Sequence, residues 1–77
     1  MKTFKGKIQK ETFVNDEWYY LDVSFKGSIL VDEKKFTDVS NYVGKEIECE
    51  VIEWDYRQKR VSDRYKVVGI VNQTIKQ

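Results

Sequence analysis

Apolar and polar residues alternate with a period of two through most of the chain, which is the pattern of strands with one buried face. The alternation predicts five β-strands, over residues 3–14, 18–25 and 28–32, from Gly44 onward, and over 61–71. Polar or glycine-containing turns separate them at residues 15–17, 26–27 and 57–60. No segment has the spacing of a long helix, so the sequence predicts an all-β fold.

The phase of the first two strands predicts their buried faces. In the first strand, Phe4, Gly6 and Ile8 share one face, and a glycine inside a strand indicates a bend or a close backbone approach. In the second strand, the predicted core face consists of Tyr19, Leu21, Val23 and Phe25. Trp18 and Tyr20 then fall on the opposite, outer face.

The third strand and the segment after it have a different character. Ile29, Leu30 and Val31 are apolar in sequence, which is typical of a strand covered on both sides or of one that closes a barrel. Residues 32–41 contain two short helical signals, each too short for a stable helix alone. We expect a short helical or 3₁₀ connector there.

The fourth strand has a clear phase at its start and an unclear one at its end. Its predicted inward residues are Ile47, Cys49 and Val51. Beyond Val51 two interpretations stay open. Either a β-bulge reverses the phase, or Trp54 and Tyr56 remain on the outer face with the neighbouring glutamates.

Five strands with a bent first strand and a connector between the third and fourth predict an OB-type small barrel. The chain has 77 residues, which is enough for one domain, predicted over residues 1–72 with a polar tail at 73–77. The N-terminus has no apolar run typical of a signal peptide, and no stretch reaches the length of a membrane span.

Composition limits the chemistry that we expect. The chain has no histidine and one cysteine, which excludes an intramolecular disulfide and disfavours a zinc site, so we expect no metal and no cofactor. No nucleophile with a base and no phosphate-binding glycine loop is present, so we expect a protein that is not an enzyme. The lone thiol fits a reducing compartment, and we expect a cytoplasmic location.

The stretch over residues 42–66 resembles the S1-type OB-fold family, whose small barrels bind single-stranded RNA. Residues 43–55 are similar to that family's glycine-led fourth strand, which ends in an aspartate, here Asp55. Arg60, Val61 and Ser62 are similar to the start of its fifth strand. The resemblance implies that Asp55 and Arg60 lie close together beside an RNA-binding face and that Arg60 contacts RNA. Leu30 stands near the place of a histidine in the family.

Two groups of residues are candidates for binding nucleic acid, because stacking needs aromatic faces and the backbone needs cations. One group lies on the outer face of the first two strands, namely Lys5, Lys7, Trp18 and Tyr20. The other lies along the predicted hairpin, namely Trp54, Tyr56, Arg57, Arg60, Arg64 and Lys66. Trp18 has a second interpretation as a plug at the end of the core, and the hairpin cations have one as charges that protect a sheet edge.

The net charge of +1 places any attraction for nucleic acid on a local surface. A stripe of acidic residues, Glu46, Glu48, Glu50 and Glu53, is expected to be a solvent face or to pair across strands with Lys and Arg. The leading hypothesis is a module that binds single-stranded nucleic acid. The alternative is a protein–protein interaction module, such as an inhibitor or an accessory subunit of a larger host or phage complex. The oligomeric state stays open, and no membrane partner is expected.

Overall fold

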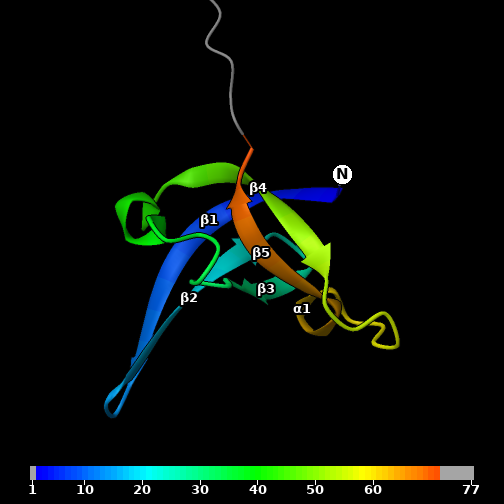
Figure 1. Ribbon diagram of the computed structural model, residues 1–77, viewed down its shortest axis with the longest axis horizontal. Helices are drawn as coiled ribbons and strands as arrows, with labels where there is room; N and C mark the ends of the chain where they lie inside the picture. Colours follow the sequence, from blue (N-terminus) through cyan, green and yellow to red (C-terminus); the bar gives the residue numbers. More distant parts are fainter. Residues whose placement is uncertain (1, 72–77) are drawn as a thin grey trace, which may run out of the picture.

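The computed structural model describes residues 2–71 and contains one five-stranded antiparallel sheet of order β3-β2-β1-β4-β5 (Figure 1). The strands are β1 (Lys2–Phe13), β2 (Asp16–Val23), β3 (Gly27–Leu30), β4 (Glu46–Glu53) and β5 (Tyr65–Ile70). A 3₁₀ helix η1 (Val39–Tyr42) lies between β3 and β4, and a one-turn helix α1 (Val61–Arg64) precedes β5. The predicted all-β class and 3₁₀ connector are confirmed. The predicted tail at 73–77 lies outside the described residues.

β1 is long enough to pair with two different neighbours. Its first half, up to Lys7, pairs with β4, and its second half, from Lys7 to Phe13, pairs with β2. Gly6 directly precedes Lys7, the residue at which β1 changes partners. A Cβ atom at Gly6 would lie 2.4 Å from the carbonyl oxygen of Asp22, so no larger residue fits without a backbone shift. This confirms the close approach that the glycine predicts.

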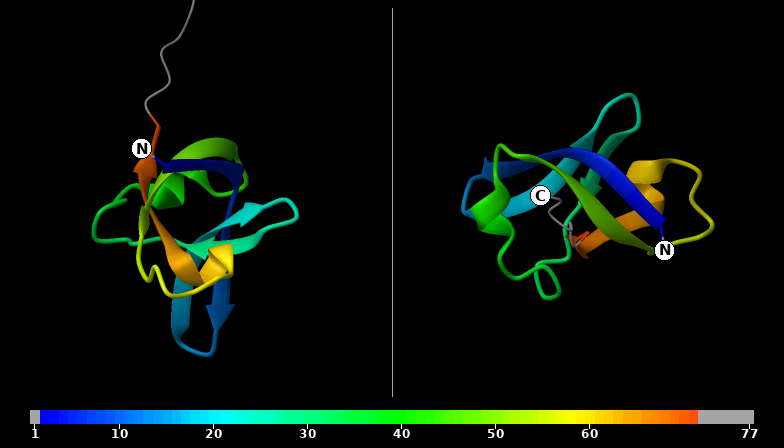
Figure 2. Two further views of the ribbon diagram at one scale, coloured as in Figure 1. Left: turned by 90° about the vertical axis from the view of Figure 1, so that its right-hand side faces the viewer. Right: turned by 90° about the horizontal axis from the view of Figure 1, so that it is seen from above.

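The two outermost strands of the sheet come together at one point (Figure 2). Val31, just beyond β3, forms an isolated parallel bridge with Val67 of β5. The amide of Asp32 donates a 2.8 Å hydrogen bond to the carbonyl oxygen of Val67. These contacts bring the end of β3 and β5 side by side, although they are far apart in the sequence.

The core lies on the inner face of the curved sheet. Its fully buried side chains are Ile8, Leu21, Ile29, Val67 and Cys49. Phe36, from the connector, and Val39, from η1, are also buried and pack against this cluster. Burial of an aliphatic or aromatic side chain of this size contributes about 1.5–3 kcal/mol relative to exposure. The predicted inward phases of β1, β2 and β4 are confirmed, including Cys49 as a core residue.

One prediction about a buried residue is wrong, and one of the two interpretations of the third strand is excluded. Phe25 is fully exposed because β2 ends at Val23, and Phe25 lies in the following turn with φ +65°. The third strand is not covered on both sides. Ile29 and Val31 are buried, but Leu30 between them is 44% exposed, because its side chain points away from the core.

The end of β4 follows neither interpretation of its phase. The register shifts between Glu50 and Val51, whose partners are Gly69 and Val67, so the extra residue, Val68, belongs to β5. β4 therefore keeps its phase to Glu53, and the two aromatic residues that follow lie in a loop beyond the strand.

The predicted fifth strand also begins too early. Residues 61–64 form one helical turn, in which the amides of Asp63 and Arg64 both donate to the carbonyl of Arg60. The turn lets Val61 pack against the core from outside the sheet.

Candidate binding surface

The loop over residues 54–60 and α1 are tied together by hydrogen bonds. The amides of Trp54 and Asp55 both donate to the carbonyl oxygen of Arg64, at 2.6 and 3.1 Å. This closes the segment into a compact unit that projects from the end of β4 (Figure 1).

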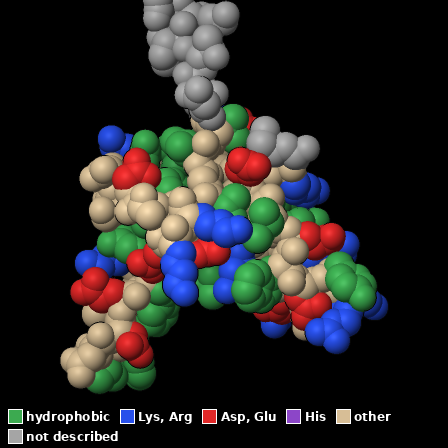
Figure 3. All heavy atoms as spheres, in the orientation of Figure 1, with side chains coloured by type: hydrophobic (Ala, Val, Ile, Leu, Met, Phe, Trp, Pro, Cys, Tyr) green, Lys and Arg blue, Asp and Glu red, His purple; other side chains and the backbone are tan. Residues whose placement is uncertain are grey.

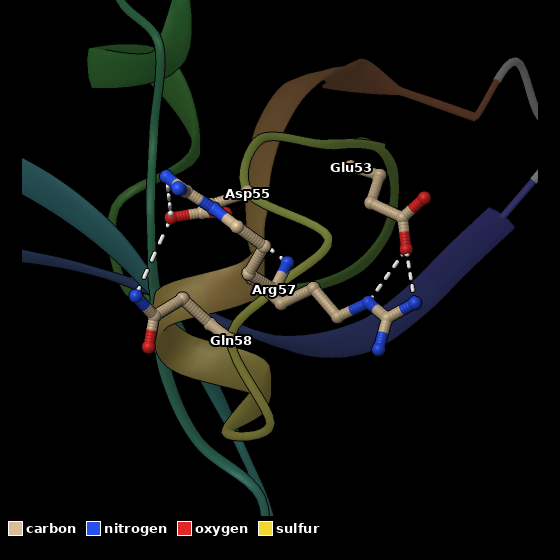
Figure 4. A network of polar contacts seen from close by, with 5 residues as sticks. Glu53, Asp55, Arg57 and Gln58 are labelled. Carbon is tan, nitrogen blue, oxygen red and sulfur yellow. Dashed lines mark hydrogen bonds and ion pairs between the residues drawn. The ribbon is translucent and has the colours of Figure 1, made fainter.

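Asp55 is the centre of this unit (Figure 4). Its carboxylate accepts hydrogen bonds from the amide and the Nε of Arg57, both at 3.1 Å, and from the Nε2 of Gln58 at 3.3 Å. These hydrogen bonds, chiefly the one from the Arg57 side chain, lower the pKa of Asp55. The carboxylate is thus charged at neutral pH and fixes the course of the loop.

Most of the positive charge in this segment is already paired. Besides Arg57 with Asp55, Arg60 binds Asp63 at 2.8 Å, and Arg64 binds Glu53 of β4. The resemblance implies that Asp55 lies beside Arg60, whereas in the structure each is bound to a different residue. Within the described chain, Lys59 and Lys66 are the two cations of this segment without an ion pair.

An open hollow of about 480 Å³ lies between this unit and β3. The lining comes from β3, the loop, α1 and β5, and consists of Leu30, Trp54, Asp55, Gln58, Ser62, Asp63, Tyr65 and Lys66. Trp54 is 59% exposed, and the Nζ of Lys66 lies 4.1 Å from the centre of its ring. A cation over an indole face is favourable and holds the ring in place. Tyr56 is 73% exposed and follows Trp54 by two residues in the sequence, but it does not line the hollow.

The outer face of β2 continues this surface. Tyr20 lies opposite Leu30 in the register of β2 and β3, and Trp18 lies two residues further along the same face. Both aromatic side chains are half-buried, and neither belongs to the core cluster. Together, Tyr20, Leu30, Trp54 and Lys66 form what we call the aromatic face.

Lys5 and Lys7 are exposed and are not part of the aromatic face, although Lys7 lies diagonally across from Tyr20 on the outer side of the sheet. In the register of β1 and β4 they are directly opposite Glu48 and Glu46. Glu48 also accepts a 2.8 Å hydrogen bond from the hydroxyl of Thr3. The acidic stripe thus faces lysines across strands, as expected. Residues 2–71 contain no group of three acidic or cysteine side chains placed to hold a metal ion.

Six lining residues were not among the binding candidates from the sequence, namely Leu30, Asp55, Gln58, Ser62, Asp63 and Tyr65. The alternation predicts one continuous strand that includes Ser62 and Tyr65. It therefore does not predict the helical turn that brings these two residues to the hollow. The spacing of Arg60 and Asp63, opposite charges three residues apart, is a signal for that turn.

No protein-family model, curated protein or solved structure matches the chain. In the described residues, no helix has the length and apolar character needed to cross a membrane.

Proposed function

We propose that the chain is an OB-type barrel of the S1-like kind that binds single-stranded nucleic acid on its aromatic face. The strand order β3-β2-β1-β4-β5 supports this, as do the shared β1, the contact between Val31 and Val67, and the 3₁₀ connector before β4. OB folds bind oligonucleotides on the surface of strands 2 and 3 and on the loops after strands 1 and 4. The hollow lies beside β3 and the loop after β4, which matches that location.

The observation that carries the proposal is the pair of Trp54 and Lys66. One face of the indole lies under the ammonium group, and the ring remains 59% exposed. A base stacks on its open side, an interaction of about 1–3 kcal/mol. Gln58 and Ser62 supply donors and acceptors for the edge of that base. A volume of about 480 Å³ is within the range of sites for small ligands.

The charge around the hollow sets the expected strength of binding. Residues 53–66 contain five cations and three carboxylates, a net charge of +2. Lys59 and Lys66 are available for phosphate contacts, since the arginines are held by carboxylates. Each phosphate contact to a single strand contributes about −0.7 to the slope of log affinity against log salt, so we expect a shallow slope of about −1.4.

Tryptophan fluorescence tests the proposal directly. In a Trp18→Phe variant, the emission reports on Trp54 alone, and a short oligouridylate or oligothymidylate should quench it at low salt. Trp54→Leu should lower the affinity roughly five- to hundredfold, whereas Trp18→Phe should leave it nearly unchanged. Absence of quenching at micromolar concentrations and low salt would contradict nucleic-acid binding on this face.

Binding to a protein is the second candidate function, favoured by the exposed Tyr56 beside Trp54 and by the paired arginines. An interface of this kind depends on buried aromatic contacts and resists salt. A complex between the chain and another protein that survives nuclease and high salt would favour protein binding over the first proposal.

A further inference from the structure

The β1–β2 hairpin extends well beyond the rest of the sheet (Figures 1 and 2). The pairing of β1 with β4 ends at Lys7, and the connector reaches only Ile8. The pairing of β2 with β3 begins at Tyr20, with one further hydrogen bond from Val31 to Tyr19. Residues 10–18, which we call the hairpin arm, therefore form a two-stranded ribbon. Within the described chain, the residues of the arm pair only with one another or with residues at its base.

The tip of the arm is apolar. Phe13 is 68% exposed and Val14 is 78% exposed, and Figure 3 shows hydrophobic side chains at the end of the arm, at lower left. Val14 also has φ +57°, a left-handed conformation that is costly for a β-branched residue. Turns of two residues usually place Gly or Asn at such a position. Neither the exposure nor the backbone conformation helps the chain to fold, and both features together mark a contact site.

The charge around the tip selects the kind of partner. The arm has one cation, Lys10, and three carboxylates, Glu11, Asp16 and Glu17, a net charge of −2. Lys10 and Glu17 pair at 3.1 Å, which leaves Glu11 and Asp16 beside the apolar tip. This charge repels the phosphates of nucleic acid and of anionic lipid, and it attracts a basic surface.

We propose that the hairpin arm is a docking element that inserts Phe13 and Val14 into an apolar socket of a protein partner with Lys or Arg on its rim. Glu11 and Asp16 pair with the rim, while the two apolar side chains supply the buried contact. The base of the arm adjoins the aromatic face through Trp18, whereas its tip at Phe13 and Val14 contains no residue of that face, so the docking does not depend on nucleic-acid binding, and both surfaces can be occupied together.

A photo-crosslinking residue tests the proposal. Benzoylphenylalanine is placed at Phe13 in the full chain, and the chain is expressed in the cells that carry its gene. The matched control has the same residue at Phe25, which is also an exposed phenylalanine at positive φ, but in the β2–β3 turn and without acidic neighbours on either side. Adducts are digested, and the crosslinked peptide of the partner is identified by mass spectrometry.

We expect one protein adduct that forms from position 13 and not from position 25, at a partner surface lined by apolar residues and rimmed by Lys or Arg. Reversing the charge with Asp16→Lys should lower its yield at least about fivefold, because the rim then repels the arm. Val14→Ser should lower it similarly. The proposal is overturned by adducts to a second copy of the chain, to lipid or to nucleic acid, by equal adducts from both positions, or by no adduct at all.

Discussion

Two segments project from the sheet on opposite sides in Figure 1, the hairpin arm and the loop after β4, and both expose aromatic side chains. The loop is held by Asp55 and by two further ion pairs, and its surroundings are positive. The arm is held by its own ladder and one ion pair, and it is acidic. The exposed aromatic residues of the loop thus lie in a rigid segment with positive surroundings. Those of the arm lie in an acidic segment that is held by fewer contacts.

The difference fits the two kinds of contact that we propose. If a base stacks on Trp54 as proposed, a loop that is ordered before binding loses little entropy. A free two-stranded ribbon is marginally stable by itself, so the arm gains most from a partner that encloses it. The following predictions test this contrast.

The largest effect is expected at Gly6, directly before the residue at which β1 changes partners. Gly6→Ala places a Cβ atom against the backbone oxygen of Asp22 and should lower the free energy of unfolding by about 3 kcal/mol, at the upper end for overpacking. Urea denaturation measures it. Gly69→Ala is the matched control, since nothing lies within 4 Å of the added atom, and it should change stability by less than about 1 kcal/mol. Equal losses in both variants would contradict the close approach at Gly6.

Alkaline titration should affect both segments equally, because it acts on their common core. Burial, with a smaller contribution from the charge of Glu48, raises the pKa of the Cys49 thiol from 9.0 to about 11. A raised folded-state pKa stabilises the fold fully below pH 9, and this contribution is lost as the pH rises to 11. We expect a loss of about 2–3 kcal/mol over this interval, relative to Cys49→Ala. Parallel pH dependences of the two proteins would show that Cys49 does not titrate as expected.

Replacement of the strained residue at the tip should stabilise the arm. Val14→Gly removes a β-branched side chain from a left-handed position and should raise the free energy of unfolding by about 1 kcal/mol. Val14→Ile keeps the strain and should give no such gain. Thermal or urea unfolding compares the two variants with the original chain. A destabilised Val14→Gly protein would mean that the valine supports the fold.

Acid should loosen the loop where Asp55 becomes protonated, at a pH below 3.8. The hydrogen bonds from Arg57 lower the pKa of Asp55 below 3.8, so their stabilising contribution is complete above that pH and is lost as the pH falls through the lowered pKa. The emission of Trp54 in the Trp18→Phe variant should shift in that interval. Adding Asp55→Asn should abolish the acid step, and an unchanged step would assign it to another group.

Much of the fold is predictable from local pattern. The inward phases of Leu21 and Val23, and of Ile47, Cys49 and Val51, follow from alternation along single strands, and the close approach at Gly6 follows from a glycine within a strand. Candidate aromatics and cations could be named in the same way. Their partners could not, because Arg57, Arg60 and Arg64 each have more than one carboxylate within reach in sequence, and the choice depends on the course of the loop.

Most of the strands and most of the buried positions follow from residue type and from neighbours one or two positions away, as does the absence of histidine chemistry. The helical turn of residues 61–64, the outward position of Leu30 beside Trp54 and the free-standing hairpin arm depend instead on the three-dimensional fold. These features arise where β3 meets β5 and where β1 changes partners. Contacts between distant segments outweigh the local alternation there, because burial against the whole sheet exceeds the preference of any single strand.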